Sequence, residues 1–587
     1  LHAALSGDLV LASDTLVLWA FDAWTGALRW RTSEPAGWDQ VDAGKVRPNG
    51  KVPILRNGFF GNDNLHKKTL IVRPAAAAGV ALAVLQVPLS RLYNEDYQDF
   101  EITKVIPERR LFAFALEDGR PLWNHAPAAD WDFESGSFEQ RMSVAAPPVI
   151  AGSRVIVPSY RMQGRVDMHV GCYDLFTGRL LWSSALVSGQ VELNMFGRQN
   201  REFNAAPVVV DGERVIVLTQ LGALAALDLY SGEILWETLY DQIPIPPASR
   251  FGGPSVERPQ VWANAAPVVT DGVVIAAPLD AFELLGLDLA TGKKLWTRTE
   301  KSVLRAPREM LAMLGADDDR VWFGGSRVYA LRAARGFAAP GGPTELSQSR
   351  DVSTSFPRPR GALTARSVIV AGNEQRFVLE RTLLTNEDRR ASAPWRDGLI
   401  AGNVTAVDGA VFFTSSRALS ACVDWRVVEQ RYRARSEAAP NELAPALEWA
   451  NIVARQARGE LDLGHVDAAL ARLAPARKKL EACATRAQPG ERPALQAALA
   501  ALLLDEARGQ ALAADPQAAL ASVERVLTLE PDDATLCRAL LRKCELLDLR
   551  GDVAARETAL EELERRCADQ WLPGDWWDEQ GRKRFAL

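Results

Sequence analysis

The chain has 587 residues, which is enough for two large hydrophobic cores and excludes a single small fold. Its formal net charge of −6 provides no basic field for nucleic acid, so that class of partner is excluded. The apolar stretch from residue 75 to 88 is shorter than a membrane span and predicts two buried strands, so no transmembrane segment is predicted.

The first ten residues already have the pattern of a strand, a turn at Ser6-Gly7-Asp8 and a second strand. The sequence begins at Leu1 rather than at methionine. We therefore expect that a leader, an anchor or a longer N-terminal part precedes these residues.

A short motif recurs five times in the first half of the chain. A small residue and a bulky apolar residue precede a glycine turn, and a tryptophan follows four residues after the glycine. Aspartate usually comes after the apolar residue, where its side chain can accept N–H bonds from the turn. The glycine–tryptophan pairs are Gly26 and Trp30, Gly119 and Trp123, Gly178 and Trp182, Gly232 and Trp236, and Gly292 and Trp296.

Further hairpins are predicted upstream of the later copies. Asp211-Gly212 and Asp271-Gly272 separate β-branched runs, a pattern typical of two-residue hairpins. Each repeat therefore predicts four short antiparallel strands. Because one such unit cannot bury both of its faces, the repeats predict a radial array, a β-propeller, with the tryptophans packed between neighbouring sheets.

The motif Ala226-Leu227-Asp228, followed by Gly232 and Trp236, resembles the tryptophan-docking repeat of the pyrroloquinoline-quinone (PQQ)-type propellers. That superfamily includes quinoprotein alcohol dehydrogenases and the BamB-like lipoproteins of outer-membrane assembly. The resemblance covers residues 1–430. It implies an all-β propeller and a periplasmic or otherwise extracytoplasmic location. Counting degenerate copies up to Asp424 gives eight blades, with seven as the alternative.

An insertion is predicted in the first part of the propeller, because the first two repeat tryptophans are the most widely separated. The extra residues lie within 31–68 and are rich in Gly, Asn and Pro, which predicts a loop over one face rather than another blade. The loop is interpreted either as a recognition element or as a lid over the channel mouth.

The apolar period lengthens near Pro440, from that of strands to that of helices. Residues 431–440 predict a linker, and residues 441–568 predict about six helices. Ala519, Val523 and Val526, followed by Pro531, resemble a tetratricopeptide (TPR) repeat, and degenerate copies surround Gly464 and Gly551. An all-α, TPR-like domain of about three helical hairpins is therefore expected after the propeller.

The tail, residues 569–587, carries Trp571, Trp576 and Trp577. So much apolar surface near a terminus predicts either that the tail folds back on the protein or that it docks onto another subunit.

The cysteines do not predict the redox compartment. Cys172 occupies the small-residue position of the repeat and is expected in the core. Cys537 and Cys544 lie two turns apart on one predicted helix, beyond disulfide reach. Pairing of Cys483 with Cys567 is left open.

The sequence offers no catalytic, cofactor-binding or metal-binding residue. The dehydrogenases of the superfamily generally carry adjacent cysteines beside the cofactor, and this chain has no Cys-Cys pair. Its five histidines are scattered, without the spacing of a metal site. Motifs of hydrolases, phosphate-binding loops and zinc proteases are absent from the sequence.

One polar constellation is predicted at the mouth of the propeller channel. It would gather loop residues from the third to fifth repeats into an anion or carboxylate site, the alternative being a solvated rim. The residues are Arg161, Arg165, Arg198, Arg201, Asn204 and Asn264.

These features favour a non-catalytic protein-interaction scaffold, a subunit of a larger extracytoplasmic or envelope assembly. Its partners would be other proteins, bound through the propeller face and the helical repeats. The alternative is a quinone-dependent oxidoreductase with a divergent site, which would use PQQ and Ca²⁺.

Overall fold

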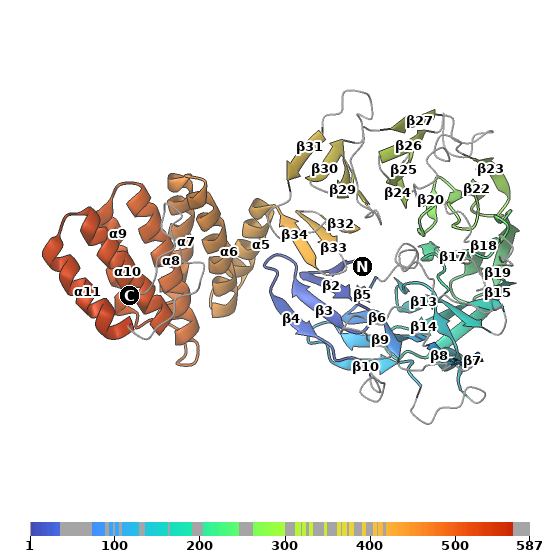
Figure 1. Cartoon of the computed structure of the whole chain (residues 1–587), viewed down its shortest axis with the longest axis horizontal. Coiled ribbons are helices and arrows are strands. Elements are labelled where there is room, and N and C mark those ends of the chain that lie inside the picture. The colour runs from blue at the N-terminus through green and yellow to red at the C-terminus, as the bar shows by residue number, and fades with distance from the viewer. Residues whose placement is uncertain are drawn as a thin grey trace. The chain divides into compact units, whose positions relative to one another are not determined.

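The computed structural model divides the chain into two compact units, Leu1–Cys422 and Val423–Leu587. Figure 1 shows the sheets of the first unit following one another around a ring, and the second unit as packed helices. The structure describes residues 2–35, 73–87, 93–97, 100–104, 108–127, 136–162, 165–190, 203–245, 262–299, 312–317, 320–324, 328–332, 345–348, 361–365, 367–371, 375–380, 390–394, 403–407, 409–414 and 418–567.

The first three sheets lie in the part of the chain before residue 190. Sheet one contains β1 (Ala4–Ser6), β2 (Leu9–Ser13), β3 (Leu18–Asp22) and β4 (Leu28–Arg31). Sheet two contains β5 (Ala75–Ala77), β6 (Val80–Val87), β9 (Glu108–Ala115) and β10 (Pro121–Asn124), and between them β7 (Tyr93–Tyr97) and β8 (Phe100–Lys104) form a separate hairpin. Helix α3 (Phe138–Arg141) precedes sheet three, which contains β11 (Ser143–Val144), β12 (Val149–Ala151), β13 (Arg154–Met162), β14 (Val166–Asp174) and β15 (Leu180–Gly189).

The remaining sheets follow in chain order. Sheet four contains β16 (Val209–Asp211), β17 (Arg214–Leu218), β18 (Ala223–Asp228) and β19 (Ile234–Leu239), and sheet five β20 (Val268–Thr270), β21 (Val273–Ala276), β22 (Leu284–Asp288) and β23 (Lys294–Arg298). Sheet six contains β24 (Ala312–Ala316), β25 (Arg320–Gly324), β26 (Val328–Arg332) and β27 (Glu345–Gln348), and sheet seven β28 (Ala362–Leu363), β29 (Ser367–Ala371), β30 (Gln375–Glu380) and β31 (Arg390–Pro394). The last sheet has three strands, β32 (Asn403–Val407), β33 (Ala410–Thr414) and β34 (Leu419–Val423).

The predicted all-β propeller is confirmed. Among the described residues, seven sheets have at least four strands, which matches the lower of the two predicted blade counts. The three-stranded sheet stands where the sequence predicted a last degenerate copy, and Thr405 in it donates a hydrogen bond from Oγ1 to the carbonyl of Ala3 (3.3 Å). The last sheet thereby contacts the first, and the ring closes.

Each repeat tryptophan from the first to the fourth copy binds the next blade. The indole Nε1–H donates to a backbone carbonyl in the next sheet's turn, three residues before the turn glycine. The bonds run from Trp30 to Leu116 (2.9 Å), Trp123 to Leu175 (3.0 Å), Trp182 to Leu229 (3.0 Å) and Trp236 to Leu289 (3.0 Å). Burial of one such ring contributes about 4–6 kcal/mol as an upper estimate, from ~150–250 Å² at roughly 25 cal/mol per Å².

The turn glycine is required for two reasons. Gly232 has a φ of +75°, which L side chains rarely adopt. A Cβ at this position would also lie 2.4 Å from the Trp182 ring. The ring therefore packs directly on the backbone of the next blade, and the spacing between glycine and tryptophan keeps this contact in register from one blade to the next.

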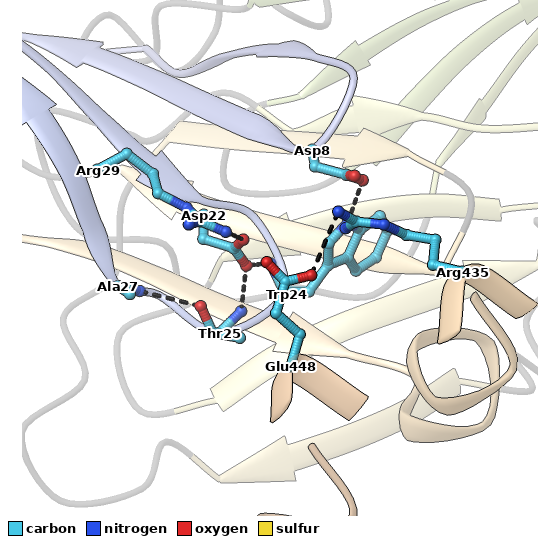
Figure 2. A network of polar contacts seen from close by, with 8 residues as sticks. All are labelled: Asp8, Asp22, Trp24, Thr25, Ala27, Arg29, Arg435 and Glu448. Carbon is cyan, nitrogen blue, oxygen red and sulfur yellow. Dashed lines mark hydrogen bonds and ion pairs between the residues drawn. The ribbon is translucent and has the colours of Figure 1, made fainter. Parts of the chain in front are cut away.

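In four of the five copies an aspartate before the turn fixes it, as the sequence predicted, and the second copy has Ala115 at that position. In the first sheet Asp22 accepts N–H bonds from Trp24 (3.0 Å) and Thr25 (2.8 Å) and pairs with Arg29 (2.7 Å), as Figure 2 shows. Burial opposes ionisation of Asp22, but the bonds from Arg29 and the turn outweigh it and hold its pKa below the ordinary value. Trp24 Nε1 donates to Asp8 (2.8 Å), which ties this turn to the preceding hairpin.

Sheets six and seven pack through a different tryptophan. Trp322, in β25, is fully buried and forms a cluster with Val328 of its own sheet and with Val368 and Val370 of the next. Its Nε1 donates to Asp317 within the same sheet (2.9 Å). The later blades therefore adhere through a second-strand side chain, which explains how they form after the glycine–tryptophan motif has decayed.

The second unit is an array of antiparallel helices. It contains α5 (Trp425–Ala438), α6 (Leu443–Asp462), α7 (Val466–Ala484), α8 (Arg492–Leu512), α9 (Pro516–Thr528), α10 (Asp533–Leu549) and α11 (Val553–Cys567). Helix α6 packs on α7, α8 on α9, and α10 on α11, so the three hairpins and six helices predicted for residues 441–568 are present. Ala519, Val523 and Val526 lie in the core between α8, α9 and α10.

The prediction of a linker at residues 431–440 is wrong. Most of that segment belongs to α5, which packs on α6, and the boundary between the units falls between Cys422 and Val423. Val428 and Tyr432 are buried on one side of this helix, four residues apart. The many arginines and glutamates of the segment lie around this narrow apolar stripe, and Glu429 pairs with Arg472 of α7.

A disulfide joins Cys537 of α10 to Cys567 of α11, with a Cα–Cα distance of 5.8 Å. The sequence did not predict this pair, and Cys483 is free. Cys172 is buried in the core as expected. The loop insertion at 31–68 lies, except for its first residues, outside the described part of the chain, and so does the tail at 569–587.

Trp236→Ala should lower the free energy of unfolding by about 3–5 kcal/mol, because the change removes both the ring from the Gly292 turn and its hydrogen bond. Leu239→Ala is the matched control on the same strand: Leu239 is 69 % exposed, and its truncation should change stability by less than about 0.5 kcal/mol. Chemical denaturation followed by tryptophan fluorescence measures both. Equal midpoints for wild type and Trp236→Ala would contradict the docking role.

Residues 423–587 expressed alone should give a helical circular-dichroism spectrum and a cooperative thermal transition. A fragment 441–587 should melt at a lower temperature, because it lacks α5 and the ion pair between Glu429 and Arg472. A random-coil spectrum for the longer fragment would mean that the helices depend on the propeller for their core.

Candidate functional site

The two faces of the propeller differ in what they carry. Because neighbouring strands are antiparallel, two turns of each sheet lie on the same face: the turn between its first and second strands and the turn between its third and fourth strands. The loops between second and third strands, and the connections from one sheet to the next, lie on the opposite face. The described residues among those predicted for the channel mouth belong to this second face, called here the loop face; they are Arg161, Arg165, Asn204 and Asn264.

The arginines of the third sheet lie at the β13–β14 hairpin. Arg161 faces Asp167 across the two strands, and the pair forms an ion pair of 3.6 Å. Arg165 is exposed in the turn between the strands. Arg198 and Arg201 lie outside the described residues. The structure therefore gives Arg161 a partner within its own blade and leaves the predicted convergence of the four arginines as a prediction.

Asn264 joins two blades. Its side chain is buried, and Nδ2 donates to the carbonyl of Ala205 (2.8 Å), while Oδ1 accepts from Gln220 (3.2 Å). Asn204 is half-buried beside Ala205, so the structure does bring the segments of Asn204 and Asn264 together. Both the oxygen and the nitrogen of the Asn264 amide are hydrogen-bonded to protein atoms, so this side chain links blades four and five.

The sequence did not reveal a larger polar network on the same face. Asp280 accepts hydrogen bonds from the Tyr240 hydroxyl (2.8 Å) and from Gln242 Nε2 (2.7 Å), and Gln220 Oε1 accepts from the backbone N–H of Leu279 (2.7 Å). Burial, together with the neighbouring Asp280, raises the pKa of Tyr240 well above its ordinary value. Tyr240 is therefore a neutral donor. The network holds the loops of blades four and five in one arrangement.

A second interblade bond accompanies the tryptophans. The residue two positions after the tryptophan reaches the carbonyl of the next turn glycine: Ser184 donates to Gly232 (2.6 Å), Thr238 to Gly292 (2.6 Å), and His125 Nε2 lies 2.9 Å from the Gly178 carbonyl. This second bond could have been predicted from the sequence, because a residue with a hydrogen-bonding side chain stands two positions after each of these tryptophans. The turns at Gly178, Gly232 and Gly292 are thus each held by an indole and by a second hydrogen-bonding side chain.

His125 is the one titratable member of this series. Its ring lies 5.1 Å from the Trp123 ring and 4.6 Å from the Tyr173 ring, and the side chain is buried. Burial lowers the pKa of His125 below 6.5, although the bond to the Gly178 carbonyl acts in the other direction. The neutral ring with a proton on Nε2 is the form that fits, so this histidine has a packing role.

The described residues contain no group of three or more His, Cys, Asp or Glu side chains placed to hold a metal ion. In the same part of the chain, no helix combines the length and the apolar character needed to cross a bilayer. On the loop face, Asn264, Gln220 and Asp280 bind neighbouring side chains and the backbone, which fixes the loops of blades four and five against each other.

A family model described as outer membrane protein assembly factor BamB matches residues 105–238 and 166–424. These overlapping matches together extend over more than half of the chain and lie within the propeller, apart from the two residues beyond Cys422. The chain belongs to this family. No curated protein matches the sequence at a significant level.

Three solved structures are similar to this chain at low sequence identity. BamB from Moraxella catarrhalis has 16 % identity and a TM-score of 0.39, over 72 % of this chain and 92 % of its own. The quinohemoprotein alcohol dehydrogenase ADHIIG from Pseudomonas putida HK5 has 13 % identity and a TM-score of 0.40, over 70 % and 69 %. The quinohemoprotein alcohol dehydrogenase from Comamonas testosteroni has 13 % identity and a TM-score of 0.39, over 72 % and 70 %.

The pH dependence of stability should contain a term from His125. Because the folded pKa lies below the unfolded one, the unfolded chain binds the additional proton, and stability is lost as the pH falls from about 6.5 toward the folded pKa. His125→Gln keeps a donor for the Gly178 carbonyl but does not titrate. Melting temperatures of the two proteins should therefore converge as the pH is lowered through this window. Parallel profiles would show that His125 is not held neutral by the fold.

Proposed function

We propose that the protein is a non-catalytic scaffold subunit of an assembly in the cell envelope, on the extracytoplasmic side. The observation that carries the proposal is the fusion of a propeller of the BamB family to an array of helical hairpins. The helices resemble TPR repeats, and arrays of this kind present a broad surface to other proteins. The expected partners are proteins.

Two features of the described residues support this location and role. The disulfide between Cys537 and Cys567 is typical of proteins that mature in an oxidising compartment, such as the bacterial periplasm. On the loop face, Asn264, Gln220 and Asp280 are engaged in bonds between blades, so they stiffen the surface and do not point at a substrate.

The alternative is a quinone-dependent oxidoreductase, a class represented among the structures with this fold. PQQ supplies a redox-active quinone, and its Ca²⁺ requires a set of carboxylate and amide ligands. The described residues offer no acidic cluster for such an ion. Because this donor set does not fit the group, no catalytic step is derived through it.

The tail residues Trp571, Trp576 and Trp577 are proposed to contact a partner, since tryptophan is frequent among residues that dominate binding energy. Affinity-tagged full-length protein should retain partner proteins from envelope extracts of its host, and the triple variant Trp571→Ala, Trp576→Ala, Trp577→Ala should lose some of them. The helical signal in circular dichroism should stay unchanged, because the substitutions keep chain length and leave the described helices intact.

Two results would contradict this function. A triple variant that keeps every partner but loses its helical signal would make the tail part of the helical core. Quinone absorbance retained by the purified protein after incubation with PQQ and Ca²⁺, together with reduction of a dye by an alcohol, would favour the oxidoreductase.

A further inference from the structure

The outermost strand of each full sheet forms an edge. In the seven sheets with at least four strands, these edge strands are β4, β10, β15, β19, β23, β27 and β31. Such a strand has backbone N–H and C=O groups on its outer side that another strand can bind, and proteins commonly block this with charged side chains, proline or a short strand.

Six of the seven edge strands have a length and sequence of this kind. They have four to six residues, and each contains a charged residue or a proline. In sequence, the charged residues and prolines are Arg29 and Arg31 in β4, Pro121 in β10, Glu237 in β19, Lys294 and Arg298 in β23, Glu345 in β27, and Arg390 and Pro394 in β31.

Strand β15 is the exception. It has ten residues, Leu180–Gly189, and contains neither a charged residue nor a proline. Among the described strands it pairs only with β14, from Tyr173 opposite Leu180 to Val166 opposite Gly189. The register runs without a shift from Trp182 to Ala185. Register shifts at Leu181 and Leu186 flank this run, so the edge is regular over the four residues from Trp182 to Ala185, and none of the ten residues of β15 carries a charge.

The side chains of β15 leave room for another strand. Ser183 and Ala185 are exposed and small, so they do not cover the backbone. Leu186 and Val187 are half-buried against the core between sheets three and four, where they offer apolar contact to side chains arriving from outside. Leu181, at the other end, is 37 % exposed.

We propose that the outer edge of β15 binds an extended segment of a partner protein as an additional antiparallel or parallel strand. Backbone hydrogen bonds supply the affinity, and the uncharged side chains of β15 select a segment in which apolar and small polar residues alternate, because a charge on the incoming strand finds no opposite charge on β15 itself and Asp167, beside Ser188, is already bound to Ser188 and Arg161. This inference rests on the proposed scaffold function and names the kind of partner segment that the scaffold holds.

The test uses full-length protein and a fluorescent ten-residue peptide of alternating threonine and valine with a Gly-Ser linker. Fluorescence anisotropy should show saturable binding, and addition of the peptide should slow amide hydrogen exchange within residues 180–189. A peptide with proline at its centre should not bind, because it cannot complete the ladder.

Two lysine variants test whether the peptide binds at β15. Ser183→Lys and Ala185→Lys give this edge the charge that the other edges carry, and each should weaken peptide binding at least tenfold. The matched control is Thr297→Lys, which alters the equivalent exposed position after Trp296 in β23. It should leave binding unchanged, and all three variants should melt close to wild type because the altered side chains are exposed.

Several outcomes would overturn the inference. Absence of saturable binding, or equal affinity in the Ser183→Lys and Thr297→Lys proteins, would show that β15 is not the site. A wild-type dimer in light scattering that becomes monomeric in Ala185→Lys would assign the edge to a second copy of this chain. If the peptide fails while the tagged protein still retains envelope partners, the scaffold function stands and only this edge is rejected.

Discussion

The propeller depends on the contact between an indole ring and the backbone of the next blade's glycine turn. This contact combines a large apolar burial with one directional hydrogen bond to a carbonyl, and it permits no side chain at the glycine, since a Cβ at Gly178 would lie 2.5 Å from the Trp123 ring. The bond fixes where the ring lies, and the burial supplies most of the adhesion. Sheets that share only an apolar face could slide along it, whereas these cannot.

The edges of the sheets and the loop face follow from that arrangement. The outermost strands contact the next blade through the tryptophan and through the residue two positions after it, such as Ser184 and Thr238, whereas side chains such as Ser183 and Thr297 are exposed. The exposed side chains of these strands can therefore vary in charge, which affects whether another strand can pair with the edge. Strand β15 has no charged residue, whereas β23 has Lys294 and Arg298. The loop face is stiffened separately, by the bonds of Asn264, Gln220 and Asp280.

The sequence predicted those parts of the fold whose determinants lie within one repeat. The glycine, the aspartate and the tryptophan are close together in the chain, so their pattern indicated both the hairpin and the contact between sheets. The bonds of Asp280 join residues 38 and 40 positions apart, and no local pattern reveals them. The same holds for Cys537 and Cys567, which only the packing of α10 on α11 brings together. The prediction of a linker at 431–440 is wrong because the apolar stripe of α5 is narrow within a polar stretch, although Val428, Tyr432 and Ser436 recur at helical spacing. Topology places Arg161, Arg165, Asn204 and Asn264 on one face, but the partners of Arg161 and Asn264 depend on tertiary contacts that no local pattern reveals.

The interblade bonds also have a direction along the chain. Each indole from Trp30 to Trp236 binds a carbonyl that lies 47 to 86 residues further toward the C-terminus, and never one behind it. A ribosome releases the chain from its N-terminus, so a blade is synthesised well before the turn that covers its tryptophan. At every stage of synthesis through these blades the growing propeller therefore ends in one uncovered indole. That exposed ring is a temporary hydrophobic surface. When the following blade emerges it covers this ring, and its own tryptophan becomes the exposed one.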